Sequence, residues 1–179
     1  MGTIDTIRLR NERFAEHHDL RGISMMPKLR SMIIGCADPR VDPANLFALE
    51  PGDAAVIRNV GGRITPATLQ TMAMLRLVAA ADPQGPPGEG WNLIVLHHTD
   101  CGINRLTGYP DLLAEHFGID TDELESKHIT DPRRSLEADV AMLKANPFLP
   151  GEFIVSGLLY DVATGLVEQV VGPERLREE

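Results

Sequence analysis

The chain has 179 residues, 43% of them hydrophobic, which is enough for one domain with its own core. Its 26 Asp and Glu residues outnumber its 17 Lys and Arg, and the net charge of −9 argues against nucleic acid or an anionic membrane as a partner. No apolar run approaches the length of a membrane span, and the N-terminus lacks the apolar core of a signal peptide, so we expect a cytoplasmic protein.

We expect a single domain over residues 1–179, with an N-terminal arm at 1–30 and a charged, frayed tail at 172–179. Within the arm, Thr3 to Leu20 mixes apolar and charged residues in the pattern of a partly amphipathic helix. A loop from Arg21 to Arg30 then leads into the body of the domain.

Four short apolar segments are predicted to be parallel strands, since each is bounded by turn residues and is too short for a core helix. They are Ser31–Cys36, Ala54–Asn59, Leu93–His97 and Phe153–Tyr160. A turn from Asp161 to Gly165 leads to Leu166–Val171, which we expect to return as an antiparallel edge strand.

Three helices are predicted where a capping residue precedes a proline, namely after Asp42-Pro43, Thr65-Pro66 and Asp131-Pro132. The apolar stripes that face the core are Leu69, Met72, Leu75 and Ala79 in the second helix, and Leu136, Val140 and Leu143 in the third. A surface loop is expected from Asp82 to Gly90, and irregular chain from Cys101 to Thr130 with a short helix around Asp111 to Phe117. The predicted fold class is therefore α/β, with a central four-stranded parallel sheet, an antiparallel edge strand and helices on both faces.

Soft metal ligands follow two of these strands: Cys36 ends the first, and His98-x-x-Cys101 follows the third. In open α/β sheets, sites form at the carboxyl ends of strands where the strand order reverses. If the two strands are neighbours there, the three side chains meet. Two thiolates and an imidazole suit Zn²⁺ and leave its fourth position open, as in catalytic sites. Strand alternation places His97 on the opposite face, so His98 is the predicted ligand.

Simpler interpretations of the two cysteines are buried free thiols, or a disulfide, which a reducing compartment disfavours. The nearby Asp38-x-Arg40 is compatible with a structural ion pair as well as with a catalytic one. The coincidence of all these positions favours a zinc site over either simpler interpretation.

The motifs Cys36-x-Asp38-x-Arg40 and His98-x-x-Cys101-Gly102 resemble the zinc signature of the β-class carbonic anhydrases. The likeness continues through Arg58-Asn-Val-Gly61 and Gly157 to Gly165, and it covers about Ser31 to Val170. Pro39 and the sequence Val60-Gly61-Gly62 depart from the residues most common in the family at these positions. Neither departure removes a candidate ligand. The resemblance is to the short, minimal branch of the family. It implies one zinc per chain and an N-terminal arm that lies across a partner subunit, hence a homodimer or a higher homo-oligomer.

A zinc ion held by Cys36, His98 and Cys101 would generate a hydroxide that attacks carbon dioxide, giving bicarbonate and a proton. Asp38 is predicted to accept a hydrogen bond from this hydroxide, and Arg40 to hold the carboxylate away from the metal. Further candidates for the surroundings of the metal or the substrate pocket are Gly61, Gly62, Asp100 and Gly102, with Asp100 expected to orient His98 or the thiolates. The candidate proton shuttles are His97 and His128.

Two other functions stay open at this stage. The first is hydrolysis of carbonyl sulfide or carbon disulfide, because the same hydroxide attacks these linear molecules too. The second is a non-catalytic zinc-binding domain, which would have no use for the Asp38–Arg40 pair. A redox thiol protein is disfavoured because the chain has no Cys-x-x-Cys motif.

Overall fold

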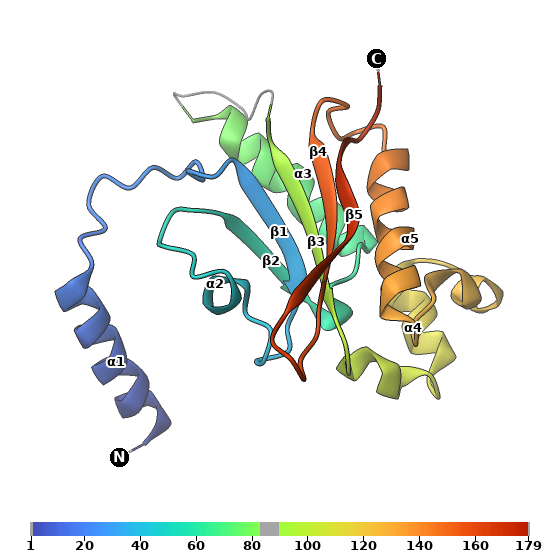
Figure 1. Ribbon diagram of the computed structural model, residues 1–179, viewed down its shortest axis with the longest axis horizontal. Helices are drawn as coiled ribbons and strands as arrows, with labels where there is room; N and C mark the ends of the chain where they lie inside the picture. The colour runs from blue at the N-terminus through green and yellow to red at the C-terminus, as the bar shows by residue number, and fades with distance from the viewer. Residues whose placement is uncertain (1, 83–89, 179) are drawn as a thin grey trace.

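A computed structural model describes residues 2–82 and 90–178, and it confirms an α/β fold built on one five-stranded sheet (Figure 1). The strands are β1 (Ser31–Cys36), β2 (Ala55–Asn59), β3 (Asn92–His98), β4 (Ile154–Tyr160) and β5 (Val167–Arg175). They lie in the order β2-β1-β3-β4-β5. The first four strands are parallel and β5 runs antiparallel to β4, as predicted.

The helices begin where the sequence predicts. They are α1 (Thr3–His17), α2 (Pro43–Leu46), α3 (Pro66–Ala80), α4 (Pro110–Phe117) and α5 (Pro132–Ala145). The side chains of Asp42, Thr65 and Asp131 each accept a hydrogen bond from a backbone N–H in the first turn of the helix that follows. Since a proline then occupies the first helical position in each case, the chain has a defined entry into α2, α3 and α5.

The main core lies between one face of the sheet and the helices α3 and α5. Its buried residues come from β1, β3, β4, α3, α5 and the segments beside them: Met32, Ile34, Ile64, Met72, Trp91, Leu93, Val95, Leu136, Val140, Leu143, Leu149, Phe153, Val155 and Leu176. On the other face α2 approaches the end of β1, where Pro43 lies against Gly35. The predicted stripe of α3 holds only in part, because Leu75 remains 37% exposed while Met72 and Ala79 are buried.

The segment that follows Cys101 is more regular than expected. It contains the 3-10 helices η2 (Gly102–Leu106) and η3 (Thr121–Lys127) on either side of α4. Ile103, Leu113 and Phe117 from this segment form a second, smaller core. The prediction of irregular chain was wrong here because 3-10 turns are too short to show an apolar period in the sequence.

The C-terminal segment also differs from the prediction. Strand β5 continues past Val171 to Arg175, and the next residue, Leu176, is buried. The Arg177 guanidinium donates to backbone carbonyl oxygens, including that of Asn146 at 2.7 Å. Residues 174–177 are therefore paired or anchored, and the expectation of a frayed tail is wrong for this part of the described chain; its charged side chains obscured the strand.

The arm behaves differently from the domain body. Helix α1 has no buried residue, and in Figure 1 it lies at the end of an extended segment, away from the sheet. The predicted loop from Asp82 to Gly90 lies outside the described residues apart from its two ends. Among the helices of the described ranges, none is both long and apolar enough to cross a membrane.

Candidate metal centre

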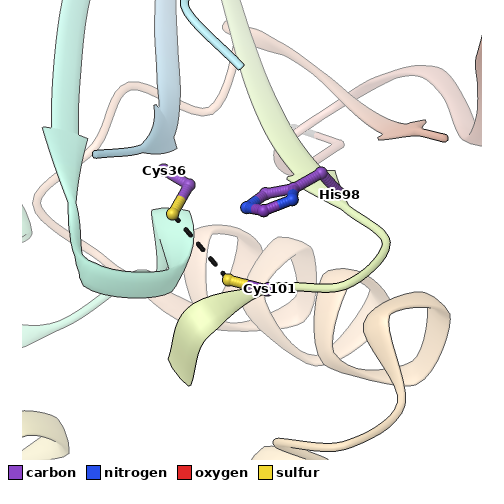
Figure 2. A group of neighbouring side chains, drawn as sticks. All are labelled: Cys36, His98 and Cys101. Carbon is purple, nitrogen blue, oxygen red and sulfur yellow. Dashed lines mark hydrogen bonds between the residues drawn. The ribbon is translucent and has the colours of Figure 1, made fainter. Parts of the chain in front are cut away.

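The candidate ligands meet where the strand order reverses. Strands β1 and β3 are parallel neighbours, and the chain leaves β1 toward β2 on one side and β3 toward β4 on the other. Cys36 is the last residue of β1 and His98 the last of β3, and the turn after β3 brings Cys101 back toward both. Figure 2 shows the three side chains converging on one point. The predicted adjacency of the two strands is confirmed.

The spacing of the donor atoms fits a tetrahedral zinc ion. Sulfur ligands at the usual Zn–S distance of about 2.3 Å and the tetrahedral angle lie about 3.8 Å apart. The Cys36 and Cys101 sulfurs are 3.8 Å apart, and the three donor atoms all lie within 4.8 Å of one another. Cys36 and His98 are buried and Cys101 is half-buried, so the donors are shielded from competing water.

The hydrogen bond of His98 fixes which ring nitrogen is available to a metal. Its Nδ1 lies 2.8 Å from the Thr99 carbonyl oxygen, which accepts hydrogen bonds only, so Nδ1 carries the proton. The lone pair is then on Nε2, which is buried and makes no hydrogen bond within the described residues. An imidazole whose Nδ1–H is held by a backbone carbonyl while Nε2 stays free has the usual arrangement of a zinc ligand.

Backbone N–H groups surround the two sulfurs. The Asp38 N–H donates to Cys36 Sγ at 3.4 Å, and the backbone N–H groups of Gly61 and Ile103 favour the thiolate forms of Cys36 and Cys101. The pKa of Cys36 falls to about 4, chiefly because the Cys101 thiol donates to its sulfur; burial opposes the shift, while His98 and the two N–H groups favour it. The two sulfurs share one proton readily, and a metal ion would take its place.

Asp38 and Arg40 form the predicted pair beside the ligands. The Arg40 Nη2 and Nε lie 2.8 and 3.1 Å from the two carboxylate oxygens, and the Arg40 backbone N–H also donates to Asp38 at 2.9 Å. This arginine holds the pKa of Asp38 at about 2. The carboxylate is therefore ionised at neutral pH and held in one orientation.

Asp100 has a different contact from the one predicted. It was expected to orient His98 or the thiolates, but its carboxylate accepts from Arg40 Nη1 at 2.8 Å and its carbonyl oxygen accepts from Arg40 Nη2 at 3.0 Å. Arg40 thus bridges Asp38 and Asp100 and ties the loop after β1 to the loop after β3. The positive φ of Asp100, 51°, turns its carbonyl and side chain to the same guanidinium.

The glycines near the ligands differ in their constraints. Gly62 has a φ of 66°, and a Cβ there would lie 2.8 Å from the backbone nitrogen of Cys36, so this position requires glycine. Gly61 also has a positive φ, and a Cβ there would lie 2.8 Å from the Ile103 side chain. A Cβ on Gly102 would meet nothing within 4 Å, so nothing in its packing requires a glycine.

Sequence reasoning did not identify the role of Arg58, a residue that entered only through the family resemblance. Its Nε donates to the Cys36 carbonyl oxygen at 2.8 Å and its Nη2 to the Asp38 carbonyl oxygen at 2.7 Å, while Asp42 holds its Nη1 at 2.6 Å. Arg58 therefore fixes the backbone of the loop that carries both Cys36 and Asp38. Backbone acceptors leave no mark in a sequence, so only the three-dimensional contact identifies this residue.

Neither candidate proton shuttle lies where a shuttle is needed. His97 is 2% exposed, and its ring nitrogens face Ser135 and Asp139 on the side of β3 opposite His98. His128 lines a surface pocket of about 480 Å³ to which none of the three candidate ligands contributes. The opposite orientation of His97 and His98 is as predicted, and it removes His97 from the site.

Comparison with known proteins finds carbonic anhydrases and a carbon disulfide hydrolase among the proteins that this chain resembles. Residues 31–117 match a family model described as carbonic anhydrase. The chain is similar to beta-carbonic anhydrase 1 of Mycobacterium tuberculosis, with 29% identity over 154 residues covering 83% of this chain and 86% of that protein. It is also similar to carbon disulfide hydrolase of Saccharolobus solfataricus, with 26% identity over 177 residues covering 83% and 81%. The solved carbonic anhydrase from Streptococcus mutans shares its fold with a TM-score of 0.71 and 31% identity, covering 95% of this chain and 98% of that one.

Proposed function

The chain belongs to the β-class carbonic anhydrase family, and from this premise we propose that it catalyses the zinc-dependent reversible hydration of carbon dioxide to bicarbonate and a proton. The observation that carries the proposal is the spacing of Cys36, His98 and Cys101 beside an ionised Asp38. A lyase of this kind needs one metal with an open position and a carboxylate next to it.

Cys36, His98 and Cys101 are the residues that would hold the zinc ion. Bound there, zinc supplies the Lewis acidity that makes water a nucleophile near neutral pH. The two thiolates cancel the charge of the ion, so water is acidified less than in a site of three histidines. We therefore expect carbon dioxide hydration to rise on the alkaline side of neutrality.

Asp38 is the proposed acceptor that orients the attacking water. Its carboxylate is ionised and only partly exposed, and Arg40 fixes it through both oxygens. The same contact keeps the carboxylate from taking the open metal position itself. Positioning of a reactant by one fixed acceptor commonly contributes factors of about 10² to 10⁴ in rate.

The decisive experiment measures two reactions on the same zinc-loaded protein. Stopped-flow carbon dioxide hydration should be fast, and sulfide release from carbon disulfide or carbonyl sulfide should be slow. Fast sulfide release with slow hydration would instead assign the activity by which the Saccharolobus solfataricus relative is named. Absence of both reactions in protein with a full complement of zinc would leave a non-catalytic zinc domain.

We also propose that the enzyme is a homo-oligomer of the cytoplasm, a dimer at least. The support for an oligomer is α1, whose Ile4, Ile7 and Phe14 are 68%, 56% and 39% exposed in the single chain. Apolar side chains gathered on a helix with no buried residue are expected to be covered by another subunit. The support for the cytoplasm is the pair of free cysteines, which a reducing compartment preserves.

A further inference from the structure

Behind the candidate ligands lies a buried charged pair that sequence reasoning did not identify. Arg63 is 1% exposed and Asp139 0%. The Arg63 Nε and Nη2 donate to the two oxygens of Asp139 at 2.8 and 3.2 Å, and Nη2 also donates to the Lys127 carbonyl oxygen at 2.9 Å. The guanidinium lies 4.9 Å from the centre of the Phe117 ring. A bidentate pair in these surroundings is rigid.

Asp139 connects α5 to the two segments that carry the surroundings of the metal. Besides Arg63, its carboxylate accepts from the Ile64 backbone N–H at 3.0 Å, and Oδ2 lies 3.3 Å from Nε2 of His97. His97 precedes the candidate ligand His98 on β3. A single carboxylate therefore anchors both the chain after β2 and the end of β3.

The turn held by Arg63 is the one that reaches the metal ligand Cys36. The Asn59 side chain closes this turn by accepting from Arg63 N and donating to Arg63 O, at 2.8 and 2.7 Å. Between them, Gly62 lies against the Cys36 backbone, where an added Cβ would be only 2.8 Å from the Cys36 nitrogen. A shift of Arg63 would therefore displace the Cys36 backbone and, with it, a candidate sulfur ligand.

We propose that Asp139 and Arg63 are positioning residues of the metal centre, which hold the turn at 59–63 so that Gly62 stays packed against the Cys36 backbone. The inference rests on the proposed ligand set, and it assigns a role to two residues that contact neither substrate nor metal. Partners outside the ligand set typically change metal affinity by about 10- to 100-fold when they are lost.

The test compares two ion pairs that each have one member on α5, one pair buried and the other exposed. The double variant Arg63→Met/Asp139→Leu removes both buried charges together, and such apolar replacements usually preserve folding. We expect its thermal midpoint to stay close to that of the parent, its zinc dissociation constant to rise about 10- to 100-fold in chelator competition, and the sulfur-to-metal charge-transfer band of the cobalt(II) protein to shift. The matched control is Arg133→Met/Glu168→Leu, which removes an exposed pair with a separation of 2.5 Å and should change neither reading.

Several results would overturn the proposal. A folded Arg63→Met/Asp139→Leu variant with parental zinc affinity and an unshifted band would make the pair purely structural, and so would equal changes in the control. If the double variant does not fold, Asp139→Asn replaces it, because one amide oxygen cannot accept all the N–H groups that the carboxylate holds. Parental affinity and spectrum in Asp139→Asn would then reject the inference. Cys36→Ser in the same assay tests the ligand set separately, since a band of unchanged position and intensity there would refute the site itself.

Discussion

A serine at position 36 or 101 would keep the size of the side chain and remove the soft donor. We expect Cys36→Ser and Cys101→Ser each to lose most of the bound zinc, because two remaining ligands with an open site hold the ion poorly. Metal analysis after gel filtration measures this directly. The control is His17→Gln, since His17 is exposed and belongs to α1, a helix that lies away from the sheet (Figure 1), and full zinc is expected there. Full zinc retention in either serine variant would refute the ligand assignment.

The Asp38–Arg40 pair is predicted to act as one unit. Asp38→Ala should leave zinc bound and lower carbon dioxide hydration by about 10² to 10⁴, because the oriented acceptor is lost. Arg40→Ala should lower it to a similar extent by releasing Asp38, whose carboxylate would then be free to approach the metal position. Since Arg40 has no carboxylate at position 38 to hold once Asp38 is absent, the double variant should be about as slow as Asp38→Ala alone. Losses that multiply in the double variant would show that the two residues act separately.

For single residues, the sequence could predict which side chains are candidate ligands and on which face of β3 each histidine lies. It could not predict every contact. Strand alternation sufficed to separate His98 from His97, because the two faces of β3 have different surroundings. It did not predict that Asp100 would pair with Arg40, since that contact depends on a left-handed turn and on the approach of two loops. Arg58 and Ile103 act through backbone groups or on them, which no residue pattern records.

Among the elements, the 3-10 turn η1 (Val60–Gly62) packs directly against the backbone of β1. Gly62→Ala combines a positive φ with a Cβ only 2.8 Å from a backbone nitrogen that cannot move without shifting β1. We expect the free energy of unfolding to fall by at least about 1–3 kcal/mol in denaturant titration. Gly108→Ala is the control, because a Cβ there meets nothing within 4 Å, and its effect should stay within about 0.5 kcal/mol. Equal stability of the two variants would contradict the close packing of η1 on β1.

The contacts that Asp139 makes from α5 should weaken in acid, because they depend on its ionised carboxylate. Burial opposes ionisation, but His97 and Arg63 outweigh it, so the pKa of Asp139 lies below its ordinary value. A carboxyl with a lowered pKa in the folded state stabilises the protein fully above the unfolded pKa of about 4, and this contribution is lost as the pH falls. The stability advantage of the parent over Asp139→Asn should therefore be constant above about pH 5 and shrink below it. Denaturant titrations across this range measure the difference, and an advantage that grows on acidification would contradict the assignment.

The elements themselves were predictable where local chemistry is strong. Asp42, Thr65 and Asp131 each combine a side-chain cap with a following proline, and all three helices begin there. The 3-10 helices after Cys101 and the full length of β5 were not predictable, because their stability comes from the small core around Phe117 and from pairing with β4. Tertiary contacts outweigh local pattern in both cases.

At the scale of the whole molecule, α1 is not packed into the described part of its own chain. Ile4, Ile7 and Phe14 lie on one side of α1, and none of its residues is buried. An isolated helix of this length is marginal in water, so it gains stability chiefly from an apolar surface to pack on. We propose a second copy of the chain as the occupant, and the extended segment between α1 and β1 lets the helix lie outside its own domain body (Figure 1).

Removal of α1 with its flanking residues therefore tests whether this helix joins subunits. Deletion of Met1 to Leu20 should reduce the molar mass measured by light scattering at micromolar concentration, and carbon dioxide hydration should fall with it. Ile7→Ser/Phe14→Ser should have the same effect in the full chain, because it removes apolar area from the face that a partner would cover. Glu12→Ser/Glu16→Ser alters the opposite side of α1 and should leave the assembly intact. A parent chain that is monomeric under these conditions, or a truncated chain with full activity, would show that α1 does not join subunits.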